Sequence, residues 1–265
     1  MGLAYDTVLM DVHNGATTAL GLTNATVATG DSFNVRSFDN PGWSKLYAMV
    51  VQGSGTRQAR ITSPRLHDNV TGLTWQGSES PSEFYLPPEI GQDLYSVDAL
   101  VPQLDAAASS DTIATMHVYY KDLQGISADL RSWHDIKSNI VNLKTMEVAV
   151  TTSATIGAWQ DTVITTTENQ LKADYKYALL GFEESAALCT VGIKGPATGN
   201  LRVCAPAASS TFPLTDYFIL MGERHGVPMI PVFKANDRAN TFISSCANQA
   251  SQTSNVYAIL AQLKN

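Results

Sequence analysis

Histidine is the side chain best suited to proton transfer or metal binding near neutral pH, and the chain holds five of them. They are His13, His67, His117, His134 and His225. None stands in an H-E-x-x-H run or in an H-x-H pair, the spacings that place two imidazoles on one face of a helix or of a strand. Only His117 falls in a clearly alternating segment, on its polar side. We therefore interpret it as a surface histidine and not as a metal ligand.

Acidic side chains gather in one proline-rich stretch of the first half. They are Glu79, Glu83, Glu89, Asp93 and Asp98. Carboxylate oxygens suit calcium, but the spacing of an EF-hand loop is absent, so we interpret the stretch as a solvated acidic loop and leave calcium binding open. A pair of catalytic carboxylates, about 5–10 Å apart in glycoside hydrolases, depends on tertiary structure that the sequence does not reveal.

The phosphate-binding and nucleophile sequences of the common enzyme classes are missing. The chain has no G-x-S-x-G elbow, no G-x-x-x-x-G-K-[ST] loop and no G-x-G-x-x-G turn. We therefore predict that the protein is not an enzyme, with no catalytic, cofactor-binding or metal-ligating residue and no cofactor. An enzyme built on a β-sandwich remains an alternative.

Three cysteines and three tryptophans each admit two interpretations. Cys189, Cys204 and Cys246 lie in apolar surroundings without paired spacing, which favours buried free thiols; a disulfide between Cys189 and Cys204 is the alternative. Trp43, Trp75 and Trp159 lie near expected loops or strand ends. We expect them to pack in the core or anchor turns, although exposed indoles there would also stack on sugar rings.

The composition predicts a β-rich protein. Of the 265 residues, 44% are hydrophobic and only 15% are charged, and Ser and Thr together outnumber all charged residues. The formal net charge of −7 and the lack of a basic arm argue against direct nucleic-acid binding. The first residues do not read as a signal peptide and no apolar run approaches 18 residues, so we expect a soluble protein that is not exported.

The first half of the chain resembles the second when the two are aligned. The matched positions are Met10-Asp11-Val12 with Met146-Glu147-Val148, Gly21 with Gly157, Thr26-Val27 with Thr162-Val163, Tyr47-Ala48 with Tyr177-Ala178, Ile61 with Ile193, and Pro64 with Pro196. We interpret this as an internal duplication of units of about 130 residues. The alternative is that the strands of both halves are alike in composition and did not arise by duplication.

Apolar and polar residues alternate along several segments, which predicts half-buried antiparallel strands. We expect strands near residues 5–12, 25–37, 45–52, 58–62, 69–76, 114–121, 145–151, 163–167, 175–182, 188–194, 201–205, 227–233 and 254–262. Seven or eight short strands per half, separated by turn residues, are typical of a sandwich or jelly roll.

Two stretches interrupt the strand pattern. Residues 129–139 carry apolar side chains at helical spacing after Ser127, a suitable N-cap, and predict a helix between the halves. A second helix is expected from Thr215 to Gly226, although its apolar run would also suit a strand. Residues 88–95 occupy the corresponding place in the first half and are expected to form a shorter counterpart.

The expected fold class is all-β, with two tandem jelly-roll-like β-sandwiches, a short helical connector and minor helices. The boundaries are 1–126 for the first sandwich, 127–142 for the connector and 143–265 for the second, a duplicate of the first. In its repeat, strand number and helix placement the chain resembles the double-jelly-roll major capsid proteins of icosahedral viruses. Most members of that family are larger, with long outer loops that this chain lacks.

The resemblance implies a structural virion protein, a major capsid or coat protein, whose homotrimers form pseudo-hexameric blocks of an icosahedral shell. Its partners would be further copies and neighbouring capsomers, with minor capsid or vertex proteins and a membrane contact left open. It would be made in the host cytoplasm and located in the virion. The alternative function is a tandem β-sandwich module that binds carbohydrate or acts as an adhesin.

Overall fold

The protein is described here from a computed structural model. It describes residues 3–14, 23–24, 44–53, 57–62, 73–77, 82–85, 92–94, 101–105, 112–122, 128–155, 158–164, 171–184, 188–206, 214–226, 228–247 and 250–264. Side chains are described for Arg60, Thr62 and Thr74 and for most of these residues after position 127.

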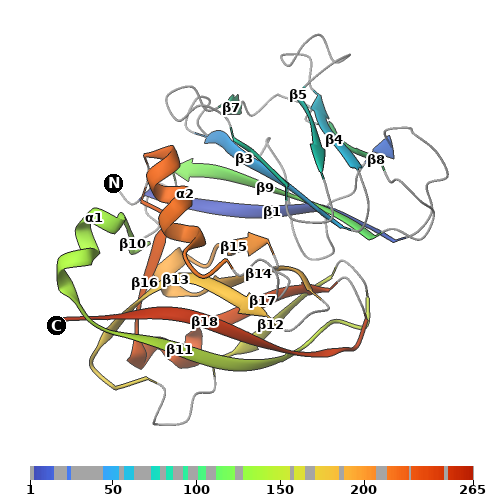
Figure 1. Cartoon of the computed structure of the whole chain (residues 1–265). Helices are drawn as coiled ribbons and strands as arrows, with labels where there is room; N and C mark the ends of the chain where they lie inside the picture. Colours follow the sequence, from blue (N-terminus) through green and yellow to red (C-terminus); the bar gives the residue numbers. More distant parts are fainter. Residues whose placement is uncertain are drawn as a thin grey trace.

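The strands before residue 123 form two antiparallel sheets, drawn in the upper part of Figure 1. They are β1 (Leu3–Asn14), β2 (Thr23–Asn24), β3 (Ser44–Gly53), β4 (Arg57–Thr62), β5 (Leu73–Gly77), β6 (Ser82–Tyr85), β7 (Gln92–Leu94), β8 (Val101–Asp105) and β9 (Thr112–Asp122). One sheet has the order β1-β9-β3-β6, with β7 also paired to β3, and the other has the order β2-β8-β4-β5.

The strands after residue 129 form two further antiparallel sheets. They are β10 (Leu130–Arg131), β11 (Ile140–Thr151), β12 (Trp159–Val163), β13 (Lys176–Glu184), β14 (Leu188–Lys194), β15 (Val203–Pro206), β16 (Ile230–Lys234), β17 (Phe242–Ala247) and β18 (Thr253–Leu263). The sheet orders are β10-β16-β13-β18-β11 and β12-β17-β14-β15. The molecule is therefore mostly β, as the sequence predicts.

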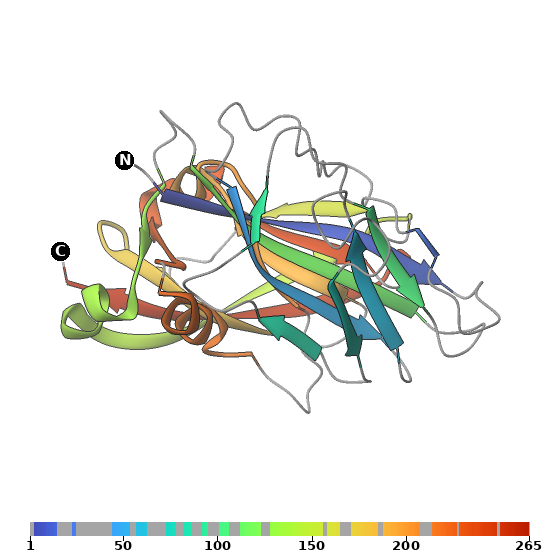
Figure 2. The same ribbon diagram turned by 90° about the horizontal axis from the view of Figure 1, so that it is seen from above.

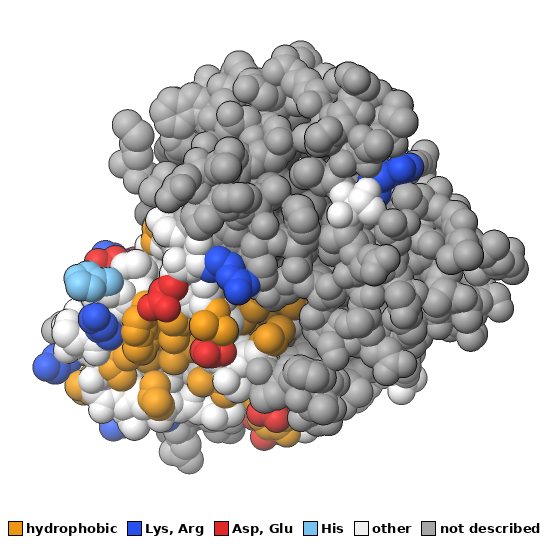
Figure 3. Space-filling model, turned by 45° about the horizontal axis from the view of Figure 1, so that its top comes forward, with side chains coloured by type: hydrophobic (Ala, Val, Ile, Leu, Met, Phe, Trp, Pro, Cys, Tyr) orange, Lys and Arg blue, Asp and Glu red, His pale blue; other side chains and the backbone are white. Residues whose placement is uncertain are grey.

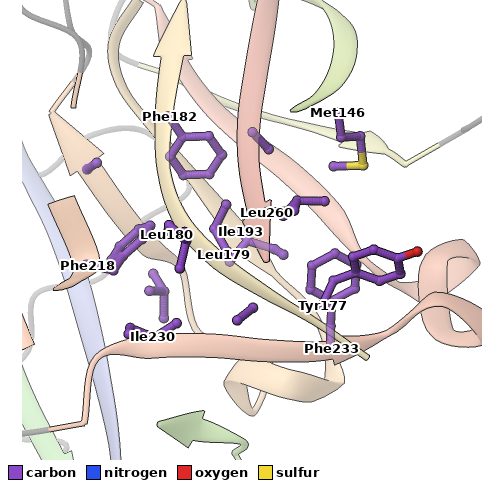
Figure 4. Packing of buried hydrophobic residues seen from close by; sticks show 14 of the residues in the cluster. Met146, Tyr177, Leu179, Leu180, Phe182, Ile193, Phe218, Ile230, Phe233 and Leu260 are labelled. Atoms are coloured by element: carbon purple, nitrogen blue, oxygen red, sulfur yellow. The ribbon is translucent and has the colours of Figure 1, made fainter. Parts of the chain in front are cut away.

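The second group of strands encloses a hydrophobic core. Along residues 146–150 of β11 and 254–260 of β18 every second side chain is buried, because strand neighbours point to opposite faces. In the core, Tyr177 of β13 lies beside Phe233 of β16, with ring centroids 6.2 Å apart (Figure 4). Fully buried apolar side chains from both sheets meet there, which holds the two layers together.

Helix α2 (Tyr217–His225) closes this core at the side where β16 diverges from β13. Phe218 of the helix contacts Phe182 of β13 edge to face, with ring centroids 6.0 Å apart. The helix begins after Asp216 and ends at Gly226, whose φ of +64° is the left-handed conformation that glycine adopts without strain. The helical prediction for this stretch is confirmed, and the strand alternative is wrong.

The connector is less helical than its apolar spacing predicts. Helix α1 covers only Trp133–Ile136 and is followed by a 3-10 turn over Lys137–Asn139, while Leu130 and Arg131 form β10 and pair with β16. Ser132 caps α1, because its hydroxyl accepts a hydrogen bond from the backbone N–H of Asp135. The predicted cap, Ser127, lies outside the described residues.

Most of the expected strands are present, with some corrections. Strand β12 covers Trp159–Val163 and overlaps the strand expected at 163–167 only at Val163, while residues 165–167 and the whole of the strand expected at 25–37 lie outside the described residues. Strand β7 occupies 92–94, so a helix through 88–95 is wrong there. The sequence did not predict β6, β8 and β17; in β17 both Ile243 and Ser244 are fully buried, so the strand has no polar and apolar alternation to detect.

The sheet β12-β17-β14-β15 is buried on its outer face as well. Thr190, Ser244 and Cys246 point away from the core yet are fully buried. Strand β1 crosses over this sheet and contacts β15 (Figures 1 and 2). No helix among the described residues is long and apolar enough to cross a membrane.

Candidate assembly surface

The described residues do not gather into a catalytic or metal-binding constellation. Among them, no group of three His, Cys, Asp or Glu side chains lies close enough to hold a metal ion. His134 is exposed on α1. His117 lies on β9, and its side chain is not among those that the structure describes. Of the acidic stretch, Glu83 falls on β6 and Asp93 on β7, while Glu79, Glu89 and Asp98 lie outside the described residues.

Strand β11 forms one edge of its sheet. Among the described strands it pairs only with β18, so its other edge carries backbone N–H and C=O groups that point away from the sheet. Such an edge can pair with a further strand. Proteins that remain monomeric usually protect it with charge, proline or a covering segment.

Apolar side chains are exposed in the first half of β11. In its second half Met146, Val148 and Val150 are buried in the core, but Val141 is 50% exposed and Leu143 is 63% exposed. Figure 3 shows apolar side chains gathered on the visible face of the second group of strands, bordered by charged ones. An edge strand with exposed Val and Leu is a surface suited to contact with another chain.

A charged cluster lies on the outer face of the other sheet. Asp161 of β12 accepts a hydrogen bond of 2.6 Å from the Ser244 hydroxyl and forms an ion pair of 3.0 Å with Lys194. Arg202 lies 3.8 Å from the same carboxylate. These contacts tie β12 to β17 and to the end of β14, so the cluster is a structural clamp across three strands.

The clamp changes the acidity of Asp161. Partial burial of the carboxyl acts to raise its pKa, but the Ser244 and Lys194 hydrogen bonds and the nearby Arg202 charge outweigh burial, so the pKa lies below its ordinary value. The carboxylate is therefore ionised at neutral pH and keeps its partners in place.

Trp159 does not offer a free stacking platform. The half-buried indole packs against the core, and the Arg202 guanidinium lies over the ring, 4.8 Å from its centroid. One face of the ring is thus occupied by a cation. The packing role expected for Trp159 is confirmed. The side chains of Trp43 and Trp75 lie outside the description.

Two of the three cysteines are buried free thiols, as the sequence predicts. Cys204 and Cys246 flank β14 on opposite sides, opposite Gly192 and Thr190 respectively, and neither forms a disulfide. Since Cys204 is a free thiol, the alternative disulfide between it and Cys189 is wrong. The Cys189 side chain lies outside the description.

No family model matches the chain, and no curated protein matches it. The solved structures that match include three of viral particles or capsid proteins. The extra small virus of the giant freshwater prawn Macrobrachium rosenbergii, solved as a virus-like particle, is 13% identical over 47% of this chain and 82% of its own, with a TM-score of 0.26.

The other two structures are matched over nearly their whole length. The major capsid protein P2 of bacteriophage PM2 is 9% identical over 98% of both chains, with a TM-score of 0.25. The nodavirus of Penaeus vannamei is 12% identical over 98% of both chains, with a TM-score of 0.26. At these TM-scores the likeness carries no argument about fold or function, so the function is argued from the chain's own strands and side chains.

Proposed function

We propose that the chain is a structural virion protein, a coat protein made of two tandem jelly rolls that assembles through trimers into a closed shell. The observation that carries this proposal is the repeated strand order of the two halves. The order β1-β9-β3-β6 matches β11-β18-β13-β16, and β2-β8-β4-β5 matches β12-β17-β14-β15. Each half thus has two sheets with a matching path of four strands, to one of which β7 or β10 is added. Two interleaved four-stranded sheets are the arrangement of a jelly roll.

The pairing register supports an internal duplication. Ile61 pairs with Leu73, the first residue of β5, and its sequence match Ile193 pairs with Val203, the first residue of β15. Such agreement is expected if both halves descend from one unit. The proposed units are residues 1–126 and 143–265, joined by a connector at 127–142.

Duplication fits a shell for a geometric reason. Three copies of a two-unit chain place six similar units around a threefold axis, which approximates a sixfold block that can tile a lattice. The low content of charged residues, 15%, also suits subunit contacts, where an unpaired buried charge is costly. The edge of β11, with its exposed Val141 and Leu143, supplies one contact surface for such an assembly.

The other functions considered receive less support. A jelly roll also serves lectins, but the one described tryptophan at a strand end, Trp159, has a guanidinium over its ring. In the charged cluster around Asp161 the hydroxyl that donates to the carboxylate, Ser244, is fully buried, so the pair holds strands together and is not open to a substrate. In the proposed role the protein resides in the virion with further copies as its main partners, and contacts with minor proteins or a membrane remain part of the hypothesis.

Light scattering coupled to size-exclusion chromatography tests the proposal. The purified chain, 28.5 kDa, is expected to elute as a trimer or as larger closed particles visible by electron microscopy in the void volume. A monomer at every concentration that also binds a glycan column would overturn the proposal in favour of the carbohydrate-binding module.

A further inference from the structure

Strand β11 has one edge bonded to β18 and a second edge directed away from the sheet. In Figure 1 β18 lies between β11 and β13, in agreement with the sheet order. The structure describes the whole of β11, Ile140–Thr151, and among the described strands only β18 pairs with it. A strand usually has about five or six residues, so this second edge is long enough to accept a complete further strand.

A hydrogen bond at the end of the β11–β18 pair shows which backbone groups of β11 face outward. The Thr152 N–H donates to the Gln252 carbonyl oxygen at 2.8 Å, and these two residues continue the register of β11 with β18. Bonded and unbonded residue pairs alternate along an antiparallel ladder. The odd-numbered residues from 143 to 151 therefore direct their N–H and C=O groups to the outer edge.

The same edge carries exposed apolar side chains. Leu143 is 63% exposed, and Val141, at a β-bulge, is 50% exposed. A lipid surface does not suit this edge, because hydrocarbon offers no hydrogen-bond partner to backbone N–H and C=O groups. A further β-strand supplies both kinds of contact, since it bonds to the backbone and packs its side chains beside those of β11.

A second copy of β11 is such a strand. When two copies of one strand meet antiparallel about a twofold axis perpendicular to the sheet, the outward N–H groups of each face the outward C=O groups of the other. Charge then restricts the register, because β11 contains two charged residues, Lys144 and Glu147. A register centred on either one would place like charges directly opposite each other, which destabilises a sheet.

The register centred on Leu143 suits the side chains best. It places Leu143 opposite its own copy and Val141 opposite Thr145, and it leaves Glu147 beyond the paired segment. A register centred on Thr145 would set Leu143 opposite Glu147, and one centred on Met146 would make the two copies of Glu147 diagonal neighbours. Pairing at Leu143 also covers the most exposed large apolar side chain among those described.

We propose that β11 of one copy pairs antiparallel with β11 of a second copy about a twofold axis at Leu143, which joins their two five-stranded sheets into one continuous sheet. This contact, which rests on the proposed function, lies between trimers. A threefold contact builds a trimer but does not link one trimer to the next, so a closed shell needs a second kind of contact. Pairing of β11 is therefore required for shells and dispensable for trimers.

Thr145→Pro tests the pairing. It removes an outward N–H that donates to the partner strand but breaks no bond to β18, and proline is tolerated on an edge strand when its nitrogen faces solvent. Trimers are expected to form, while the protein concentration needed for shells, measured by light scattering, rises about tenfold or more. Thr151→Pro is the matched control, because it removes an outward N–H of the same strand beyond the paired segment. It should form shells like the natural chain.

The possible outcomes separate the pairing from the proposed function. Shells from Thr145→Pro at the concentration that the natural chain needs would refute the pairing and leave the proposed function standing. A Thr145→Pro chain that melts normally but stays monomeric would also refute it, because the contact would then lie within the trimer. A natural chain that is monomeric at every concentration overturns both.

Cysteine cross-linking decides the register, even if both proline variants fail to fold. Leu143→Cys treated with a short bismaleimide should give covalent chain dimers in shells, because the two thiols meet at the axis. Thr151→Cys should not, since its thiols would lie about 50 Å apart. The natural chain is the blank, with Cys204 and Cys246 buried. Shells in which Leu143→Cys gives no dimers, or in which both variants give them equally, would refute pairing at Leu143.

Hydrogen exchange distinguishes strand pairing from a contact made by side chains alone. The amides of Leu143 and Thr145 should exchange rapidly in trimers and about tenfold or more slowly in shells, because they become hydrogen-bonded only there. The amides of Lys144 and Met146, which face β18, should be protected in both states. Shells in which the two outward amides still exchange rapidly would show that no strand covers this edge and would contradict the proposal.

Discussion

At the scale of single residues, Asp161 shows how a charged side chain can join neighbouring strands. Its carboxylate joins Ser244, Lys194 and Arg202 from three different segments. Because its pKa is lowered in the folded state, the ionised form stabilises the fold above the pKa of the unfolded chain, about 3.9. That stabilisation is lost as the pH falls through the lower folded pKa.

The variant Asp161→Asn tests this clamp. We expect the free energy of unfolding at pH 7 to fall by about 1–2 kcal/mol, because hydrogen bonds to a charged group are lost and two cations lose their counter-charge. Urea unfolding at several pH values measures it. The difference from the natural chain should shrink below pH 4, whereas Glu147→Gln, an exposed carboxylate on β11, should have little effect. An equal loss in both variants would contradict the clamp.

Gly192 lets β14 and β15 approach closely. A Cβ at this position would lie 2.4 Å from the Cys204 sulfur and 2.6 Å from the Val203 carbonyl oxygen. Gly192→Ala is therefore expected to destabilise the protein by about 1–3 kcal/mol in thermal unfolding. Adding Cys204→Ala should recover only part of the loss, since the carbonyl contact remains; full recovery, or no loss in the single variant, would be inconsistent with this packing.

At the scale of elements, the sequence predicts strands well where one strand face is exposed to solvent and poorly where both faces are buried. Residues 146–150 of β11 and 254–260 of β18 alternate between buried and more exposed side chains, and the strands predicted at 145–151 and 254–262 lie within β11 and β18. Strand β11 begins earlier than predicted, at Ile140, within the expected connector. β17 is buried on both faces and was missed, and the connector helix is short because Leu130 and Arg131 pair with β16 instead. The spacing of apolar residues does not reveal which neighbouring strand a segment will pair with.

The functional surface could not be predicted from the sequence for the same reason. In the sequence, Val141 and Leu143 look like ordinary core residues of a strand. The sheet order shows that they lie on an edge strand, which pairs with no described strand on its outer side.

Leu143→Asp tests the edge of β11. Since this side chain is 63% exposed, the melting temperature of the monomeric protein should change little, but assembly measured by light scattering should fall. Leu220→Asp on α2, at a side chain that is 54% exposed, is the matched control and should assemble normally. Equal behaviour of the two variants would exclude β11 as a contact surface.

At the scale of the whole molecule, the repeated sheet order and the exposed apolar edge of β11 point the same way. In the proposed account, two similar units in one chain let three copies pack around a threefold axis with near-sixfold regularity. A freely diffusing monomeric module would need neither feature.

Cryo-electron microscopy of the assembled protein tests the central claim most directly. The account predicts capsomers with threefold symmetry and six similar β lobes, two from each chain, arranged in a closed shell. Particles in which each chain contributes a single lobe, or a protein that stays a dispersed monomer under all assembly conditions, would contradict it.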